Sequence, residues 1–473
     1  MLHAILLLAQ GILSVGVLYY VFGVGLLPSN ISFICLGILL ALFLLCLLLQ
    51  ISRNGTLRSI GAILSIFICG MLVVGLLYLQ RINQALSEIS RAQLQTDNMV
   101  VVVRVEDPAQ SIEDTVGYAY GICATGSSDR LSEMIADVEA LVGETLDITE
   151  YPSPYEQGNA LLNGDTDALI YNSALTSLLD EVIKDYSERV RVIYAKELTY
   201  EVETEETEPP ADGNAPITER AFNVYISGID VSGPIATTSR SDVNIIMTVN
   251  ARTHKILLTT TPRDYYVVIP GISGDMRDKL THAGIYGVGA SMAALGNLYG
   301  VQMDYYLRIN FTSLIRLVDV LGGVDVHSEY AFSHGSYKFV QGINHLDGDA
   351  ALAFSRERYA FPSGDNQRGR NQQAVITAII AKLQSPDVLK NAEEIMRVFS
   401  QSIQTNVPKE DIVLLINNQI SGMPHWSVES QQATGTGDSQ PTYSMGGLNL
   451  YVMWPDEEAV LKLSDKMQRL LAE

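Results

Sequence analysis

The first eighty residues constrain the chain more than any other feature, because they hold three long apolar runs and almost no charge. Asp, Glu and Lys are absent from residues 1–80, where the full charges are Arg53 and Arg58. The first run is too long for the core of a cleaved signal peptide, and it leads directly into a second run. Each run is close to the ~20 residues that a helix needs to cross a bilayer, and together they cover about residues 4–27, 31–49 and 60–79. We therefore predict three transmembrane helices in residues 1–80, which anchor the chain in a lipid bilayer.

The two arginines also predict the orientation of these spans. Both lie in the short connection between the second and third runs, at residues 51–58. The positive-inside rule places such a loop in the cytoplasm, so the third span carries everything after residue 80 to the outside. The interiors of the spans hold no charged side chain, which favours anchoring over transport. The expected localisation is the cell membrane, multi-pass, with the soluble domains on the extracytoplasmic side.

The rest of the chain is strongly acidic and poor in cysteine. All 53 acidic residues follow residue 80, with all but two of the 31 basic ones. A surface this negative is a poor docking face for nucleic acid, which demands basic patches. Cys123 is the one cysteine beyond the apolar runs. The soluble part therefore has neither a disulfide framework nor the Cys/His spacing of a metal site.

Two soluble domains are predicted, joined by a linker. Residues 81–199 begin with a polar helical stalk over residues 81–98 and then alternate strand and helix patterns from Met99 onward. This alternation predicts an exported accessory α/β domain with a parallel sheet. It carries no cluster of titratable residues, so we expect a structural or partner-binding role. Residues 200–216 are acidic and contain prolines, as expected of an extended solvated linker.

Residues 217–473 form the second predicted domain, an α/β/α fold with a central mixed sheet. Continuous β-rich runs read as strands covered on both faces, and they occupy residues 222–226, 243–249 and 255–260. Helices are expected over residues 278–298, with a break near Gly284, and over residues 311–321 and 370–384. A polar loop over residues 427–445, a strand over residues 448–454 and an amphipathic helix over residues 457–471 complete the pattern.

Residues 354–372 are unusually rich in arginine. They carry Arg356, Arg358, Arg368 and Arg370. Guanidinium groups at this density repel one another unless an anion lies among them, and their planar forks match phosphate oxygens two at a time. On a strand, Arg356 and Arg358 would share a face. Arg368 and Arg370 lead the next helix, whose N-terminal amides also favour anions. The segment therefore predicts a cradle for a diphosphate.

Carboxylates and a further arginine lie upstream, at the ends of predicted strands. Asp230 and Asp242 flank strands at the edge where α/β sheets gather ligands. Mg²⁺ is bound by one or two carboxylates plus phosphate oxygens and water, so these two aspartates suffice. The competing interpretation is that both aspartates only serve turns. Arg263, stiffened by the preceding proline, would donate to the phosphates, or would merely pair with Asp264.

Six blocks in order resemble the LytR-CpsA-Psr family. They are Ser-Gly-Ile-Asp230, Thr-Ser-Arg240-Ser-Asp242, Thr-Pro-Arg263-Asp264, Lys279-Leu-Thr-His-Ala283, Gly-Gly-Val-Asp325-Val and Ser-Arg356-Glu-Arg358 continuing to Arg368-Gly-Arg370-Asn-Gln372. Relatives often have Asn where this chain has Thr281. The three spans and the extra exported domain resemble the capsule-assembly branch of that family, of Gram-positive type.

The resemblance implies a function and a set of site residues. Members attach glycopolymers to peptidoglycan, taking the polymer from an undecaprenyl-pyrophosphate carrier and forming a phosphodiester, usually with Mg²⁺ (or Mn²⁺). It implies a polyprenyl pocket with walls at Leu280–Leu298 and Phe311–Leu321. Capsule or cell-wall assembly proteins are implied as further partners. The implied metal ligands are Asp230 and Asp242, and the implied pyrophosphate ligands are Arg240, Arg263, Arg356, Arg358, Arg368, Arg370 and Gln372.

Two other functions stay open at this point. A membrane-anchored regulator could sense lipid-linked precursors through the accessory domain. A hydrolase could use the same arginine cradle to release the glycan to water. Asp230 or Asp242 is the nearest candidate for a general base, although a metal-ligand role would exclude it.

Overall fold

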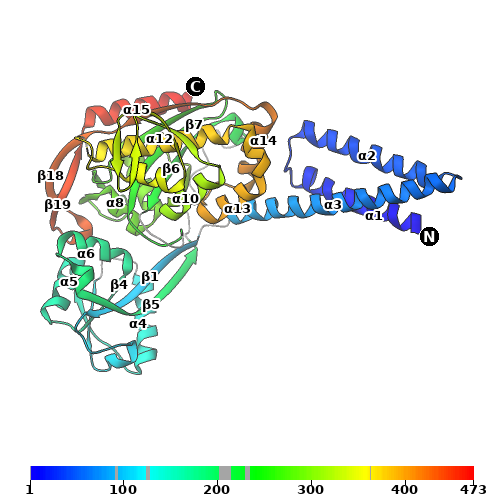
Figure 1. The fold of residues 1–473 in the computed structure, drawn as a ribbon. Helices are drawn as coiled ribbons and strands as arrows, with labels where there is room; N and C mark the ends of the chain where they lie inside the picture. Colours follow the sequence, from blue (N-terminus) through cyan, green and yellow to red (C-terminus); the bar gives the residue numbers. More distant parts are fainter. Residues whose placement is uncertain (1, 91–93, 124–127, 202–214, 230–234, 363) are drawn as a thin grey trace.

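The computed structural model describes residues 2–90, 94–123, 128–201, 215–229, 235–362 and 364–473. Figure 1 shows the N-terminal helices projecting to one side of the larger body. We call residues 94–201 the accessory region and residues 215–473 the C-terminal region. Asp230 and most of the predicted linker lie outside the described residues.

Three helices in the described part of the chain are long and apolar enough to cross a membrane, as predicted. They are α1 (Leu2–Leu18, extended by a π-helical turn to Gly23), α2 (Ser29–Ile51) and α3 (Gly55–Ser90). One buried hydroxyl joins all three: Ser65 donates to Gln10 Oε1 over 2.8 Å and accepts from Gln50 Nε2 over 2.8 Å. Such polar contacts hold helices together where burial of apolar side chains gives no driving force.

The accessory region is a five-stranded sheet in the order β3-β2-β4-β1-β5. Its strands are β1 (Leu94–Arg104), β2 (Ala119–Cys123), β3 (Asp147–Tyr151), β4 (Ala168–Asn172) and β5 (Val190–Glu201). Its main helices are α4 (Ser128–Val142), α5 (Pro154–Asn163), α6 (Thr176–Val182) and α7 (Tyr186–Arg189).

Two sequence predictions for this region were wrong. The sheet is mixed and not parallel, because β1 pairs antiparallel with both β4 and β5. The helical stalk does not reach residue 98, since residues 94–98 pair with residues 197–201 at the start of β1. Polar residues there resemble a solvated helix, but the long partner strand β5 supplies their backbone hydrogen bonds.

The C-terminal region is built on a six-stranded mixed sheet in the order β16-β11-β6-β7-β8-β17. The strands are β6 (Ala221–Ile229), β7 (Ser241–Asn250), β8 (Lys255–Thr261), β11 (Tyr305–Asn310), β16 (Gln404–Thr405) and β17 (Ser427–Gln432). β6, β7 and β8 pair antiparallel, whereas β11 and β17 add parallel strands at either side. This confirms the predicted mixed sheet.

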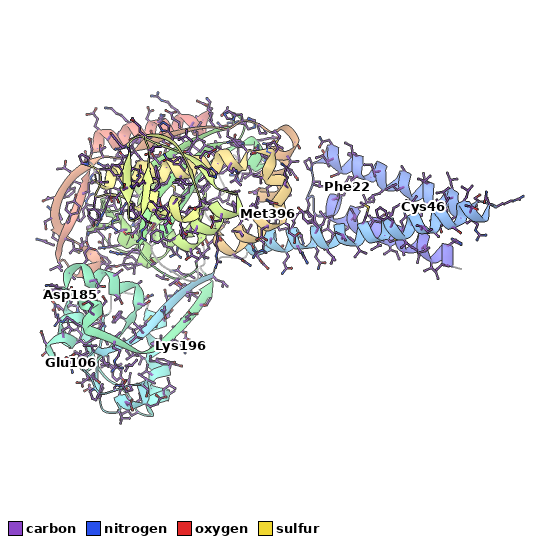
Figure 2. All side chains as sticks on the ribbon, in the orientation of Figure 1. Phe22, Cys46, Glu106, Asp185, Lys196 and Met396 are labelled. Atoms are coloured by element: carbon purple, nitrogen blue, oxygen red, sulfur yellow. The ribbon has the colours of Figure 1, made fainter. Side chains whose placement is uncertain are left out.

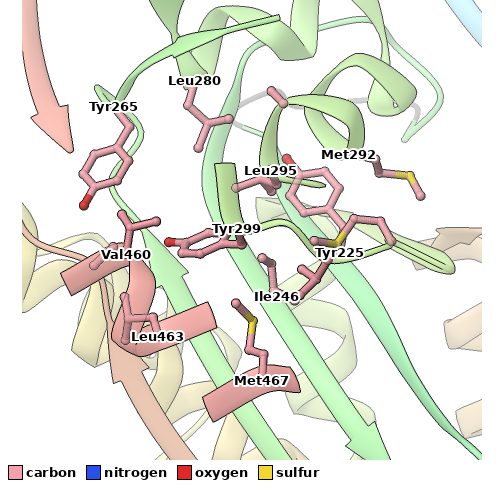
Figure 3. Packing of buried hydrophobic residues seen from close by; sticks show 14 of the residues in the cluster. Tyr225, Ile246, Tyr265, Leu280, Met292, Leu295, Tyr299, Val460, Leu463 and Met467 are labelled. Carbon is pink, nitrogen blue, oxygen red and sulfur yellow. The ribbon is translucent and has the colours of Figure 1, made fainter. Parts of the chain in front are cut away.

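Helices cover both faces of this sheet. On one face lie α8 (Leu280–Ala283), α9 (Val288–Tyr299) and α15 (Glu457–Ala472). Their apolar side chains form a core with Tyr225 and Ile246 of the sheet (Figure 3). On the other face lie α10 (Phe311–Val320), α11 (Gly348–Arg356), α12 (Asp365–Leu383), α13 (Ala392–Ser402) and α14 (Lys409–Gly422).

The predicted polar loop over residues 427–445 is mostly strand. Residues 427–432 are β17, which pairs parallel with β8, and β18 (Gly435–Pro441) forms a hairpin with β19 (Asn449–Pro455). Both β17 and β18 carry mainly polar side chains because they lie at exposed sheet edges. Their composition therefore resembles a loop, although neighbouring strands satisfy their backbones.

The C-terminal region packs directly on the stalk half of α3. Arg81 Nη1 lies 2.9 Å from Glu393 Oε1 of α13, and Lys409 Nζ of α14 lies 2.6 Å from Asn83 Oδ1. Met396 packs into an apolar cluster at the same junction (Figure 2). The helix that leaves the third apolar span thus holds α13 and α14 close to its exit.

Candidate functional site

Asp242 and Arg263 meet where two inner strands of the central sheet, β7 and β8, have adjacent ends. Asp242 lies at the start of β7 and Arg263 follows the end of β8, and these ends coincide because the two strands are antiparallel neighbours. Arg263 Nη1 donates to Asp242 Oδ1 over 3.0 Å, and Thr281 Oγ1 donates to the same oxygen over 3.1 Å. Thr281 comes this close because Gly284 lets the turn after α8 touch the strand: a Cβ there would lie 2.6 Å from the backbone nitrogen of Ser241.

Three more arginines reach the same place from α11, α12 and the segment between them. Arg356 is the last residue of α11, Arg358 follows it, and Arg368 lies in the first turn of α12. Arg356 and Arg358 do not lie on a strand, so the expected shared face of a strand was wrong. Arg356 is held by stacking over the Phe311 ring, 4.4 Å from its centroid.

These side chains line one cavity of about 650 Å³ with an apolar interior. Arg368 and Gln372 line it from the start of α12, and apolar side chains of the same helix follow as far as Leu383. Fifteen residues of helix separate Arg368 from Leu383, about 22 Å. The charged end and the apolar end of the cavity are therefore well separated. Its apolar lining includes Ile226, Met247, Leu307, Phe311, Leu314, Leu317, Val375, Ile376, Ile379, Ile380, Phe399 and Ile403.

The predicted walls of an apolar pocket are half confirmed. Phe311, Leu314 and Leu317 of α10 line the cavity. Leu280 and Leu295 do not, because α8 and α9 pack on the opposite face of the sheet, in the core of Figure 3. The apolar face of α12 takes their place. Sequence periodicity identifies an apolar helix face but not which side of a sheet it covers.

Electrostatics keep the Asp242–Arg263 pair charged. Burial opposes ionisation of Asp242, but the charges of Arg263 and Arg240 outweigh it and hold the pKa of this carboxyl below its usual range. Burial likewise works against the charge of Arg263, yet Asp242 and Asp264 raise its pKa overall. For Arg368, burial and the neighbouring arginines prevail over the ion pair with Asp365 and lower its pKa. The site is thus a crowded set of cations that an anion would stabilise.

The structure does not bring every predicted ligand to the cavity. Arg370 lies two residues beyond Arg368, about 200° around the helix. It donates to Glu329 Oε2 over 3.1 Å and lines a separate polar cavity of about 570 Å³ on the other side of α12. Arg240 is also absent from the cavity lining, and its Nη1 lies 3.4 Å from Glu181 Oε2 of the accessory region.

A metal ion is compatible with the residues present. Within the described residues, no three His, Cys, Asp or Glu side chains form a group that could hold a metal by themselves. Both contacts to the Asp242 carboxylate given above fall on Oδ1. Its Oδ2 could therefore serve a Mg²⁺ ion whose other ligands come from phosphate oxygens and water.

Sequence reasoning missed His334 and Tyr359, which also line the cavity. His334 Nδ1 lies 2.6 Å from Glu357 Oε2, so Glu357 pairs with this histidine. His334 ends a short hairpin, β13 (Phe332–His334) with β14 (Tyr337–Phe339). No local signal in the sequence points to it, because only the fold brings this hairpin to the end of α11.

Guanidinium groups that open into a long apolar cavity define a protein suited to an anion attached to a long apolar chain. Residues 191–469 match the LytR_cpsA_psr family, and the chain belongs to this family. It is 35% identical over 223 residues to the polyisoprenyl-teichoic acid–peptidoglycan teichoic acid transferase TagU of Enterococcus faecalis, covering 46% of this chain and 72% of that protein. It is 30% identical over 252 residues to TagU of Bacillus subtilis, covering 53% and 78%. The crystal structure of B. subtilis TagU superposes with a TM-score of 0.42 at 28% identity, covering 54% of this chain and 98% of that one.

Proposed function

We propose that this protein transfers a glycopolymer from a polyprenyl-diphosphate carrier to peptidoglycan, forming a phosphodiester. One observation carries the proposal: a single cavity joins Arg263, Arg356, Arg358 and Arg368 to an apolar interior. Arginine forks bind phosphate oxygens. The apolar walls would bury the prenyl chain, and each Å² of apolar surface removed from water contributes about 25 cal/mol to the free energy of binding. The family relationship to transferases that act on a polyisoprenyl-linked polymer supports it.

The proposed reaction is a phosphoryl-type displacement. A hydroxyl of the peptidoglycan glycan attacks the phosphorus that carries the polymer. The bond from this phosphorus to the bridging oxygen breaks, polyprenyl phosphate leaves, and the hydroxyl proton passes to a base. The arginines would neutralise charge that builds on the leaving phosphate. Mg²⁺, when bound, would add further neutralisation.

Asp242 is better suited to hold a cation or an arginine than to act as that base. Arg263 and Arg240 keep its pKa low despite burial, and a low pKa makes a carboxylate a weak proton acceptor. We assign it a positioning role toward Arg263 and a proposed metal-ligand role. Asp230 lies outside the described residues, and its role as ligand or base rests on the family resemblance.

We further propose that the polymer is a capsular polysaccharide and that the reaction takes place outside the cell membrane. The first point is supported by the order of the chain. Three apolar helices come first, the accessory region follows them, and the C-terminal region comes last. Arg53, between α2 and α3, and Arg58, in the first turn of α3, support the second. The packing of α13 on α3 would keep the apolar end of the cavity, at Phe399 and Ile403, close to the bilayer.

A reconstituted assay tests the proposal. The full-length protein in nanodiscs would be incubated with Mg²⁺ and a polyprenyl-diphosphate-linked oligosaccharide, with and without uncrosslinked peptidoglycan. We expect polymer-linked glycan and polyprenyl monophosphate only when the acceptor is present. Equal release of monophosphate without acceptor would identify a hydrolase, and binding without turnover would identify a sensor.

A further inference from the structure

One carboxylate of the accessory region reaches the edge of the proposed diphosphate site. Glu181 lies near the end of α6, and its two oxygens contact different cations of the C-terminal region. Oε1 accepts from Lys279 Nζ, and Oε2 lies 3.4 Å from Arg240 Nη1. Glu181 thus bridges two segments, one of which leads directly into β7 and Asp242.

The bridge continues into the cavity through alternating charges. Lys279 Nζ also lies 3.5 Å from Asp264 Oδ1, and Asp264 Oδ2 lies 3.9 Å from Arg263 Nε. Arg263 in turn donates to Asp242. Three cations (Arg240, Lys279 and Arg263) therefore face three carboxylates (Glu181, Asp264 and Asp242) between the accessory region and the cavity.

Because Lys279 needs a carboxylate partner, the alternation of cations and carboxylates depends on Glu181. Its side chain is only 2% exposed, and a buried ammonium group is costly unless it is paired. Its two carboxylate partners come from different regions, Glu181 from the accessory region and Asp264 from the C-terminal region. Without Glu181, two carboxylates would have to serve three cations, and Arg240 would turn toward Asp242.

The position of Glu181 is itself well fixed. Leu178 and Leu179 of α6 are buried in one core with Met445 and Leu450 of the C-terminal region. At the same junction a Cβ on Gly446 would lie 2.3 Å from Ser153 Cβ, so the two backbones are in close contact. A carboxylate on such a support can hold an arginine in place rather than follow it.

We propose that Glu181 is a positioning residue for the diphosphate site: it holds Arg240 and neutralises Lys279, so that Asp242 and Asp264 remain available to orient Arg263. The accessory region is then a structural part of the transferase site. This inference rests on the proposed function. An arginine that is held before the ligand arrives loses less conformational freedom on binding, which strengthens binding.

Binding of farnesyl diphosphate to the full-length protein in nanodiscs tests this inference, because binding can be measured without turnover. Removing a negative charge would by itself tighten binding of an anion. Positioning predicts the opposite sign, namely that Glu181→Gln weakens binding about tenfold. The matched control is Glu188→Gln, at an exposed glutamate of the same region, which should leave the Kd unchanged.

A double-mutant cycle identifies the residue through which Glu181 acts. If it acts through Arg240, the double variant Glu181→Gln/Arg240→Ala should bind no more weakly than Arg240→Ala alone. Glu181→Asp keeps the charge and should recover part of the affinity. If Glu181→Gln lowers the melting temperature, the Kd of Glu181→Asp is compared with that of the wild type instead.

The possible results distinguish failure of the positioning role of Glu181 from failure of the proposed function. Failure of the wild-type protein to bind the probe would overturn the proposed function. Normal binding by wild type together with unchanged or tighter binding by Glu181→Gln would overturn the positioning role and leave the proposed function standing. Additive losses in the cycle would exclude Arg240 as the residue through which Glu181 acts, and would leave its pairing with Lys279 as the route.

Discussion

Arg368 and Arg370 show how position on a helix decides what a side chain can contact. They are two residues apart in a segment that is dense in arginine, yet they lie on opposite sides of α12. Arg368 lines the large cavity beside Arg263 and Asp242, whereas Arg370 donates to Glu329 and Gln367 at the smaller polar cavity. Charge density in the sequence therefore overstates the number of arginines at the site.

The pair provides a matched test of the cradle. Arg368→Ala should lose ~1.5–3 kcal/mol of charge-assisted hydrogen bonding to the diphosphate, a ten- to hundredfold loss in kcat/KM for transfer. Arg368→Lys should recover little, because a point charge cannot replace the planar fork. Arg370→Ala should stay within about threefold of wild type. Equal losses at both positions would mean that bulk positive charge, and not the lined cavity, binds the substrate.

Asp242 sets a pH dependence of stability. The pKa of Asp242 in the folded protein is below its usual value. The paired, ionised carboxylate therefore stabilises the fold fully above the pKa that an aspartate has in the unfolded chain, about 4. This stabilisation is lost as the pH falls further, toward the pKa in the folded protein. Asp242→Asn should therefore lower the melting temperature by a constant amount between pH 7 and 5. The difference from wild type should shrink below about pH 4. A difference that already shrinks between pH 7 and 5 would contradict a lowered pKa.

At the scale of elements, α12 separates two environments. One of its faces lines the apolar cavity and the other faces the polar cavity and solvent. Its mixed composition hides this division, because glutamines and asparagines near its start occur on both faces. The wall of the cavity is visible only when α10, α12 and the sheet are placed together.

Filling the cavity should affect carriers according to the length of their prenyl chain. Ile376→Trp would occupy apolar volume beyond Gln372 and should weaken binding of an undecaprenyl carrier by about tenfold, while farnesyl diphosphate loses little. Ala381→Leu, on the exposed side of the same helix, is the control and should change neither Kd. Equal weakening of both carriers by Ile376→Trp would show that the prenyl chain lies elsewhere.

At the scale of the whole molecule, the chain couples a membrane anchor to two packed regions. The helix α3 continues from an apolar span into a polar segment that holds α13 and α14, and the accessory region shares a core with the hairpin β18–β19 and its connection. The C-terminal region is therefore held in a fixed position relative to the three apolar helices. Flexible tethering would not require such contacts.

The proposed orientation across the membrane rests on Arg53 and Arg58 and can be tested directly. In a chain without its four native cysteines, Lys184→Cys places a thiol at a side chain that is 92% exposed in the accessory region. It should react with a membrane-impermeant maleimide in intact cells. Asn54→Cys, in the arginine loop, should react only after permeabilisation. The reverse pattern would place the site in the cytoplasm and exclude a peptidoglycan acceptor.

The sequence by itself determined the features that depend on local composition or on order along the chain. The apolar runs identify the spans because a bilayer excludes charge, and the spaced Asp and Arg blocks identify the family. The β-rich runs of the C-terminal region identify a sheet covered on both faces. These signals can be read without knowing which elements touch.

Only the tertiary structure decided which side chains share a site. It placed Arg370 away from the cavity, His334 beside it, and Leu280–Leu298 on the far face of the sheet. It also brought Glu181, about sixty residues before Arg240 in sequence, into contact with that arginine. The physical reason is that packing of the elements, and not sequence spacing, sets the distances between side chains, so a charge from another region can complete a site that the local motifs only outline.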